Sequence, residues 1–343
     1  MANIFARSPY LIKIDEAGQS GSKVELFLSN TTFSVNPQYT LSKLIPASNN
    51  LETLYDISPY IREYISFADY SPTNTFTTNP TAQRVNVRVK RYKLVVSTYT
   101  LLDTTDYIAF DGYGYYEYGS NYNLGDFGLS LEKNYFYVNS HAGIFRAVTG
   151  TGYTARYTNL NTLAVTNVAL TSNTVLDIAR VIVANQFDGN KLEILDATLT
   201  VLAIYNFYPK EECKYEPVTI DFVNQFGAWQ REFFFKASND TFSVENTEYN
   251  LLQTDSFNYN VQEGQRKIFN ANGKKSIKVN TDWVDENWKE TLQQIMLSER
   301  ILIGGSPAKI NTKSTELFKH INTKQINYTL EFEFAYDVIN SVI

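Results

Sequence analysis

The sequence contains few of the residues on which most enzyme chemistry depends. Its 343 residues include one cysteine, Cys213, and two histidines, His141 and His320, which lie far apart in the chain. A single cysteine excludes an intrachain disulfide, and we interpret it as a small, partly buried hydrophobic residue. Two distant histidines are a poor supply for a catalytic triad or a metal cluster. We therefore expect a non-enzymatic protein without a cofactor or a resident metal.

Long apolar runs and a large excess of positive charge are also missing. No stretch of about twenty apolar residues predicts a transmembrane helix. The first residues, MANIFARSPYLIKID, lack the apolar core of a signal peptide. The formal net charge is -6, whereas nucleic-acid binding normally needs a basic surface. We expect a protein made in a reducing cytoplasm, without membrane insertion and without recognition of nucleic-acid sequence.

Aromatic and β-branched residues are abundant instead. The chain has 25 tyrosines and 22 phenylalanines. Together with valine, isoleucine and threonine they fill the alternating segments, which is typical of strands. The length predicts two or three domains. We predict a mainly β fold made of tandem antiparallel β-sandwich-like domains, with expected bounds of 1–107, 108–212 and 213–343.

The predicted first domain alternates apolar and polar residues in several segments. Residues 10–14 and 23–28 flank a Gly-rich turn and are expected to pair as an opening hairpin. A short helix is expected over 57–65, with Ser58 as its cap. Residues 84–98 predict a long strand with a row of basic side chains on one face. We interpret that row either as a solvated sheet face or as a contact with another subunit or a ligand: Arg84, Arg88 and Lys90.

Residues 111–128, DGYGYYEYGSNYNLGDFG, are rich in glycine and tyrosine. Glycine permits tight turns, and tyrosine combines a flat apolar ring with a hydroxyl, which suits interfaces and sugar stacking. We predict a hairpin with an exposed tip. Its tyrosines either pack locally or form a contact surface for another subunit or a glycan: Tyr113, Tyr115, Tyr116 and Tyr118.

The predicted last domain is an antiparallel sheet with a single helix on one face. An amphipathic helix is expected over 283–299, with Asp282 as its N-cap. Residues 325–336 alternate as a strand does, and their apolar side is expected to receive the helix. This strand would also offer an edge for pairing with a neighbouring subunit. The candidate core consists of Trp288, Leu292, Ile295, Phe332 and Phe334.

Two carboxylates, Glu331 and Glu333, lie on the opposite side of that last strand. Paired carboxylates carry out glycoside hydrolysis, but the alternation of a solvated strand explains this pair more simply. We treat both as candidate interface residues, and a glycan-degrading enzyme stays a third-ranked hypothesis.

Several blocks of the sequence resemble structural proteins of phages that infect Bacteroidetes hosts, including crAss-like and flavobacterial phages. The blocks are spread over nearly the whole chain: RSPYLIKIDEAGQSGSKVELFL (7–28), YTLSKLIP (39–46), YDISPYIREYI (55–65), FDGYGYYEYG (110–119), TIDFVNQFGAWQREFFFKAS (219–238) and INYTLEFEFAYDVINSV (326–342). They contain no known catalytic signature, so no active-site residue is carried over. The resemblance implies a virion component of the tail, neck or baseplate.

A sheet with one helix on a face is also similar to the domain that builds phage tail-tube and distal-tail rings. In those rings, sheets of neighbouring subunits join edge to edge. The leading hypothesis is therefore a structural subunit of a ring or collar in the virion, whose partners are copies of itself and neighbouring tail or neck proteins. The alternative is a host-surface or glycan-binding adaptor, or a receptor-binding component of the tail.

Overall fold

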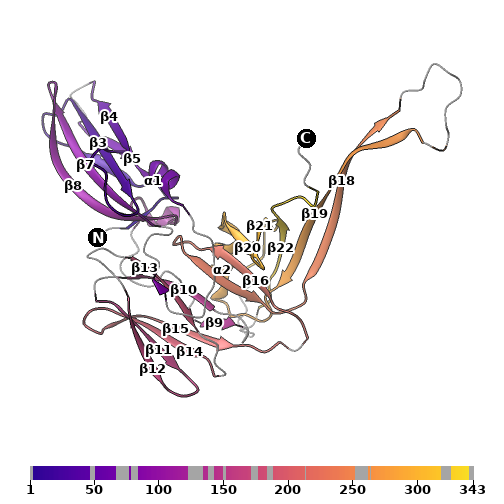
Figure 1. Ribbon diagram of the computed structural model, residues 1–343. Helices are drawn as coiled ribbons and strands as arrows, with labels where there is room; N and C mark the ends of the chain where they lie inside the picture. The colour runs from indigo at the N-terminus through magenta and orange to yellow at the C-terminus, as the bar shows by residue number, and fades with distance from the viewer. Residues whose placement is uncertain are drawn as a thin grey trace. The chain divides into compact units, whose positions relative to one another are not determined.

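A computed structural model of the chain describes residues 3–46, 51–66, 77–78, 84–122, 134–137, 143–149, 152–170, 177–183, 188–212, 214–251, 262, 264–317 and 326–339. The protein is mainly β, with several sheets in tandem β-sandwich-like regions, as the sequence predicts (Figure 1). The chain divides into two compact units, residues 1–211 with 222–232, and residues 212–221 with 233–343. The expected boundary after 212 falls beside the start of the second unit, and the one after 107 lies inside the first.

The first unit begins with a five-stranded sheet in the order β1-β8-β7-β3-β4. Its strands are β1 (Asn3–Phe5), β3 (Gly21–Ser29), β4 (Tyr39–Leu44), β7 (Arg84–Val95) and β8 (Thr98–Phe110). β1 pairs with β8 in parallel, and the other pairs are antiparallel. A two-stranded sheet pairs β2 (Leu11–Ile14) with β5 (Thr53–Asp56), and the helix α1 (Ser58–Tyr64) follows.

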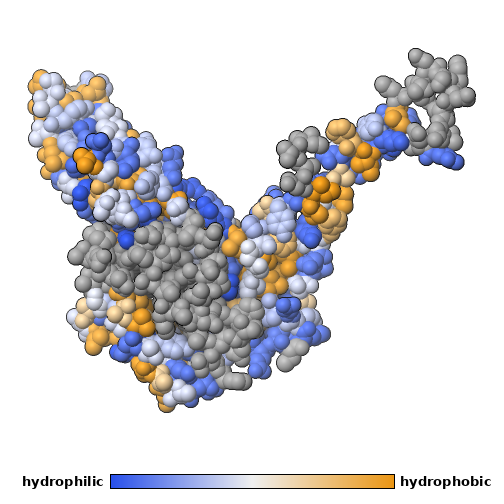
Figure 2. Space-filling model, viewed as in Figure 1, coloured by the Kyte–Doolittle hydropathy of each residue, from blue (hydrophilic) through white to orange (hydrophobic). Residues whose placement is uncertain are grey.

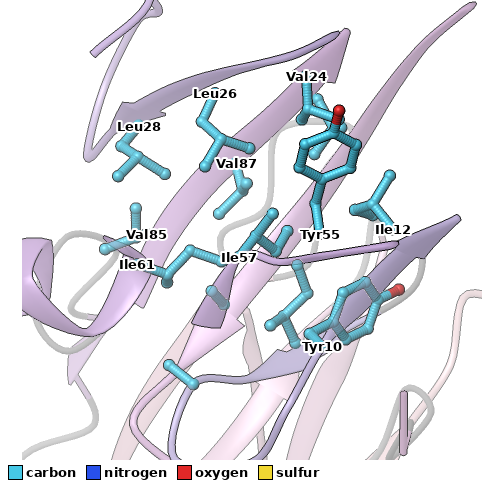
Figure 3. Close-up of a cluster of buried hydrophobic side chains, with 14 of the residues drawn as sticks. Tyr10, Ile12, Val24, Leu26, Leu28, Tyr55, Ile57, Ile61, Val85 and Val87 are labelled. Carbon is cyan, nitrogen blue, oxygen red and sulfur yellow. The ribbon is translucent and has the colours of Figure 1, made fainter. Parts of the chain in front are cut away.

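An apolar core lies between these two layers. Alternate residues of β3 and β7 point to the same side and are buried, as strand periodicity requires. Those residues are Val24, Leu26, Leu28, Val85, Val87 and Val89. The segments around β2, β5 and α1 supply the opposite layer with Tyr10, Ile12, Tyr55, Ile57 and Ile61. Figure 3 shows side chains from both layers directed toward one another, which makes this region a sandwich.

The strands β2 and β3 do not form the predicted hairpin with each other. β2 pairs with β5, and β3 pairs with β4 and β7, so residues 10–14 and 23–28 lie in different sheets. The alternation of apolar residues identifies both strands correctly, because β2 and β3 direct their apolar side chains into the same core from opposite layers. The pattern shows which side of a strand is buried but does not show which strand it pairs with.

Ser58 does not cap α1 as predicted. The N-cap residue is Ile57, which makes no side-chain cap hydrogen bond, and Pro59 lies in the first turn. The Ser58 hydroxyl accepts a hydrogen bond from the Tyr10 N–H at 2.7 Å and donates one to the Ser8 carbonyl at 2.7 Å. It therefore joins the helix to the segment that precedes β2.

Two further sheets belong to the first unit. One has the order β12-β11-β14-β15-β9 and contains β9 (Asn134–Tyr137), β11 (Thr154–Asn159), β12 (Val165–Ala169), β14 (Asn190–Leu195) and β15 (Val201–Pro209). The other has the order β10-β13-β6 and contains β6 (Thr77–Thr78), β10 (Gly143–Thr149) and β13 (Asp177–Val183). One side of the larger sheet is apolar and buried, with Leu192, Ile194, Tyr205 and Phe207 on it.

The C-terminal sheet has seven strands in the order β17-β16-β20-β21-β22-β19-β18. They are β16 (Val218–Val223), β17 (Trp229–Phe234), β18 (Asn239–Asn250), β19 (Arg266–Asn280), β20 (Ile301–Ile303), β21 (Ser306–Ile310) and β22 (Thr329–Phe334). The helix α2 (Trp288–Leu297) lies between β19 and β20 in the chain. Gly304 and Gly305 join β20 to β21 with φ values of 55° and 85°, which suits a two-residue hairpin turn.

The helix α2 begins later than the predicted residue 283. Asp282 has a φ of 67°, in the left-handed region, and Val284 forms a β-bridge with Ile326 instead of a helical turn. The carboxylate of Asp285 accepts a hydrogen bond from the Trp288 N–H at 3.2 Å. An acidic side chain therefore does serve the start of this helix, but it is Asp285 and not the predicted Asp282.

One face of α2 packs into the apolar core of the second unit. The Trp288 ring stacks on Tyr328 with ring centroids 5.9 Å apart, and it meets Phe234 edge-on, also at 5.9 Å. Such aromatic pairs add to the stabilisation that comes from burial itself. Of the other predicted core residues, the structure buries Leu292, Ile295 and Phe332 completely and leaves Phe334 half-buried.

Replacing Trp288 with alanine should lower the free energy of unfolding by about 3–5 kcal/mol, because the cavity left by the ring cannot be filled. Trp288 is 8% exposed. Urea unfolding followed by far-UV circular dichroism measures the change. The matched control is Trp283→Ala, since that ring is 59% exposed, and its effect should stay within about 0.5 kcal/mol. Equal effects of the two substitutions would contradict the packing of α2 described above.

Candidate interaction surfaces

The Gly/Tyr-rich segment does not form the predicted hairpin within residues 111–122. The chain leaves β8 in an extended conformation, makes the short 3-10 turn η1 (Tyr116–Tyr118) and then passes Gly119, whose φ is 74°. Residues 123–128, in the rest of the predicted hairpin, lie outside the described residues. Within residues 111–122 the glycine and tyrosine pattern therefore reflects an extended segment with a short turn and not two paired strands.

The four candidate tyrosines differ in exposure. Tyr113 is buried, Tyr115 is half-buried, and Tyr116 and Tyr118 are exposed. Burial raises the pKa of the Tyr113 hydroxyl. Contacts join their rings in a row, from Tyr113 to Tyr115 at 5.9 Å, from Tyr115 to Tyr118 at 5.6 Å, and from Tyr118 to Tyr122 at 4.8 Å. Local packing thus accounts for most of the segment, and Tyr116 is the fully exposed ring.

A tight turn after β16 holds this segment in place within the first unit. The Tyr113 N–H donates a hydrogen bond to the Gln225 carbonyl at 2.8 Å. A Cβ atom on Gly227, whose φ is 76°, would lie 2.8 Å from the Asp111 backbone nitrogen, and one on Gly112 would lie 2.6 Å from the Gln225 oxygen. The two backbones touch so closely that only glycine fits at these positions. A small apolar cluster surrounds the contact: Phe5, Ile108, Phe110, Phe226 and Ala228.

The basic row on β7 is paired within its own sheet. The Arg88 guanidinium donates two hydrogen bonds to the Asp106 carboxylate of β8, at 2.7 and 2.9 Å, and this raises the pKa of Arg88. Exposed pairs of this kind contribute about 0–1 kcal/mol each. The rest of the row consists of Lys90, which lies over the Phe27 ring, and Arg84, which donates to Asn86. These contacts favour the interpretation of a solvated sheet face.

Glu331 and Glu333 take part in ordinary strand contacts. Glu331 is exposed, while the Glu333 carboxylate lies 2.7 Å from the Lys309 ammonium of the neighbouring strand. The hydrogen bond from Lys309 lowers the pKa of Glu333. A carboxylate kept ionised by a lysine on the adjacent strand is a cross-strand ion pair, and nothing in this geometry places the two glutamates toward a shared substrate.

The edge predicted for the last strand is not an edge. β22 lies inside the sheet, with β21 on one side and β19 on the other. Among the described strands, β18 ends the sheet on that side. All twelve of its residues are exposed. The sequence pattern of 325–336 correctly indicated a strand, but an interior and an edge strand share the same alternation.

β18 and β19 extend together beyond the rest of the sheet (Figure 1). β19 pairs with β22 only over residues 276–280, whereas it pairs with β18 along the whole of β18. We call β18 together with residues 266–275 of β19 the arm. An isolated two-stranded hairpin is marginally stable in water, and beyond β22 the described support of the arm consists of the bonds that Val338 and Ile339 make with residues 272–273.

The arm also carries exposed apolar side chains, which Figure 2 shows as hydrophobic surface along it. Phe242 is 57% exposed, Val244 59% and Phe269 69%. The Phe242 ring lies over Gly273 of the neighbouring strand, where a Cβ would come within 2.4 Å of it. Tyr249 and Ile268 add to this surface. Apolar surface that gathers on one projecting element is typical of a protein–protein contact.

Sequence reasoning missed the arm. Its signals were the alternation of Phe242 and Val244 between polar residues, and a separation of acidic residues on β18 from basic residues on β19. Both signals are weak in isolation, because alternation does not show whether anything covers the apolar side.

Candidate groups for chemistry are few in the described residues. No set of three or more His, Cys, Asp and Glu side chains there is grouped so that it could hold a metal ion. Cys213, His141 and His320 lie outside the described residues. None of the helices that the structure describes has the length and hydropathy needed to cross a bilayer.

Comparisons with protein families, with curated proteins and with solved structures found no significant match.

Replacing Gly227 with alanine should destabilise the first unit by about 2–4 kcal/mol. The left-handed backbone accounts for about 1–2 kcal/mol of this, and the overlap of the new methyl group with the Asp111 backbone accounts for the remainder. Gly119→Ala is the matched control, because Gly119 has a φ of 74° and no atom within 4 Å of its Cβ position. The Gly119→Ala variant should lose only the free energy of unfolding that the left-handed backbone costs an alanine. Thermal unfolding measures both, and a Gly227→Ala variant as stable as Gly119→Ala would rule out the close contact.

Proposed function

We propose that this chain is a non-enzymatic structural protein of a phage virion, a subunit of an oligomeric ring or collar in the tail, neck or baseplate. Its partners are copies of itself and neighbouring tail or neck proteins, and it is made in the cytoplasm of the host bacterium. The observation that carries the proposal is the exposed edge strand β18, with an apolar surface on the arm that it forms with β19.

An exposed strand edge is a liability for a protein that works alone. Its outward N–H and C=O groups can pair with any other strand, so proteins that stay monomeric shorten, cover or charge such edges. Here the edge carries Asp240, Glu245 and Glu248, but it is twelve residues long and also has exposed phenylalanine and valine side chains. A subunit that meets the same partner in every assembly has a use for such an edge, since the partner covers it.

Two further features support an assembly role. Sequence blocks that resemble virion proteins of Bacteroidetes phages are distributed over both compact units. The second unit has the expected plan of a sheet with α2 packed on one face through Trp288, which is similar to the ring-building domain of phage tails.

The alternative, a host-surface or glycan-binding adaptor, rests on the exposed rings of Tyr116 and Tyr118. Exposed aromatic rings suit sugar stacking, but the other two tyrosines of the segment are buried or half-buried in local packing. We rank this function second for that reason.

The proposal predicts that the purified chain forms discrete oligomers and that the same chain occurs in assembled virions. Mass photometry over a dilution series measures the first, and cryo-EM density of virions locates the second. A defined multiple of the chain mass, together with density in the tail, neck or baseplate, is the expected result. A chain that stays monomeric at every concentration and is absent from virions would contradict the proposal.

A further inference from the structure

We infer that the arm joins copies of this chain head to tail, with the outer edge of β18 in one copy paired to the open edge of β19, residues 266–271, in the next. The arms of neighbouring copies point in the same direction. The inference rests on the proposed function to the extent that both require self-assembly, and it adds the contact, its polarity and the residues that select it.

The first part of the argument is which backbone edges are open. In the described part of the chain β18 has a paired strand on one side only. β19 pairs with β22 over 276–280, and the next residues toward the tip bind the C-terminal segment, where Val338 N–H donates to the Gly273 carbonyl at 2.8 Å and Asn272 bonds with Ile339. Among the described residues, the part of the β19 edge without a paired segment is therefore 266–271.

The second part is strand direction. β18 runs from the sheet toward the tip of the arm, and β19 runs back from the tip toward the sheet. When two arms lie side by side and point the same way, β18 of one copy is antiparallel to β19 of the next. The hydrogen-bond ladder of one arm then continues into the neighbouring arm as an ordinary antiparallel sheet. This turns a marginal two-stranded hairpin into part of a larger sheet.

The third part is charge, and it identifies the partner as a second copy of the chain. β18 carries Asp240, Glu245 and Glu248 and no basic residue. β19 carries only basic charges, from Arg266, Lys267, Lys274, Lys275 and Lys278. On the open edge of β19, residues 266–271, the charges are Arg266 and Lys267, which are complementary to the acidic β18, so each copy presents both halves of the same contact. Opposite charges across paired strands stabilise the pairing.

The same separation of charge argues against a two-fold dimer. A two-fold contact through β18 would set two acidic strands side by side, and one through β19 would set two basic strands side by side, and like charges across strands are unfavourable. A head-to-tail contact uses two different surfaces and closes into a ring when the rotation between copies permits it. Within one arm Glu248 is paired with Ile268 and lies near Lys267 and Arg266. Two arms at the same height would bring Glu248 of one copy to the same residues of the next, so these residues near the tip decide the contact.

Charge reversal tests this contact. Glu245→Lys with Glu248→Lys makes the β18 edge basic, and Arg266→Glu with Lys267→Glu makes the β19 edge acidic. Each double variant sets like charges against each other in a head-to-tail contact, so its oligomer should dissociate at a concentration at least about tenfold higher than the wild type. Sedimentation velocity over a dilution series measures this.

Two combinations should restore assembly. The quadruple variant exchanges the charges of both edges within one chain, and it should associate within about threefold of the wild type, well inside a tenfold change. An equimolar mixture of the two double variants should also form oligomers, because the reversed edge of each fits the reversed edge of the other. Far-UV circular dichroism checks that every variant is folded. If the quadruple variant is unfolded, the mixture of the two double variants tests whether assembly is restored.

Two controls isolate the edge contact. Lys274→Ala removes the 2.8 Å pair between Lys274 and Glu245 inside the arm and should leave association unchanged. That result would show that the Glu245→Lys variant does not lose its oligomers merely because this pair is lost. Glu290→Lys with Lys313→Glu reverses two exposed charges elsewhere in the second unit and should also leave it unchanged.

The outcomes separate this inference from the proposed function. Loss of assembly in both double variants, with recovery in the quadruple variant or in the mixture, supports the head-to-tail contact. Oligomers that persist in both double variants overturn the contact and leave the proposed virion role standing. Loss in the double variants without recovery in either combination also overturns it. A wild-type chain that stays monomeric at every concentration overturns the contact, and the proposed function falls with it only when the chain is also absent from virions.

Discussion

The constraint on which the account depends is that a β-strand must satisfy the hydrogen-bonding groups on both of its edges. In the interior of the sheets neighbouring strands do this, as β21 and β19 do for β22. For β18 only one side is satisfied by the described chain, and its side chains are exposed along the full length of the strand. Water can satisfy such an edge, but water does not favour the exposed apolar rings that accompany it.

Elsewhere in the described molecule apolar surfaces are closed by internal packing. The N-terminal sandwich closes its apolar faces between two layers, and even the serine expected to cap α1 is used to join that helix to the segment before β2. The turn at Gly227 presses backbone against backbone at Asp111 and Gly112. In the second unit Trp288 seats α2 on the sheet through Tyr328 and Phe234. In contrast to these closed contacts, the arm leaves apolar side chains exposed, and we propose that a partner covers them.

The sequence predicts most strands well, because alternation of side chains is a local property of a strand. The strand over 84–98 with its basic row on one face is correctly predicted, and the apolar side of the strand around Phe332 is buried as expected. Pairing is not local, so the expected hairpin of 10–14 with 23–28 was wrong although both strands exist. The start of α2 was placed too early, because Val284 has the spacing of a helical residue and yet forms a bridge with Ile326.

The candidate sites show the same limit. Tyrosine and glycine in 111–122 indicate a turn with aromatic contacts, but which rings are exposed depends on packing against Phe5 and on the turn at Gln225, both distant in sequence. Glu331 and Glu333 look alike in sequence, and only the structure places Lys309 beside one of them. The edge position of β18 follows from the order of the whole sheet, which no segment of the sequence contains by itself.

The central claim is that β18 pairs with another copy of the chain, and amide hydrogen exchange tests it most directly. The exchange of the β18 amides that point away from β19 is compared between the assembled wild type and the dissociated chain. If a neighbouring strand covers the edge, these amides should exchange at least about tenfold more slowly in the assembly, while the amides paired with β19 change less. Equal exchange of the outward amides in both states would contradict the account.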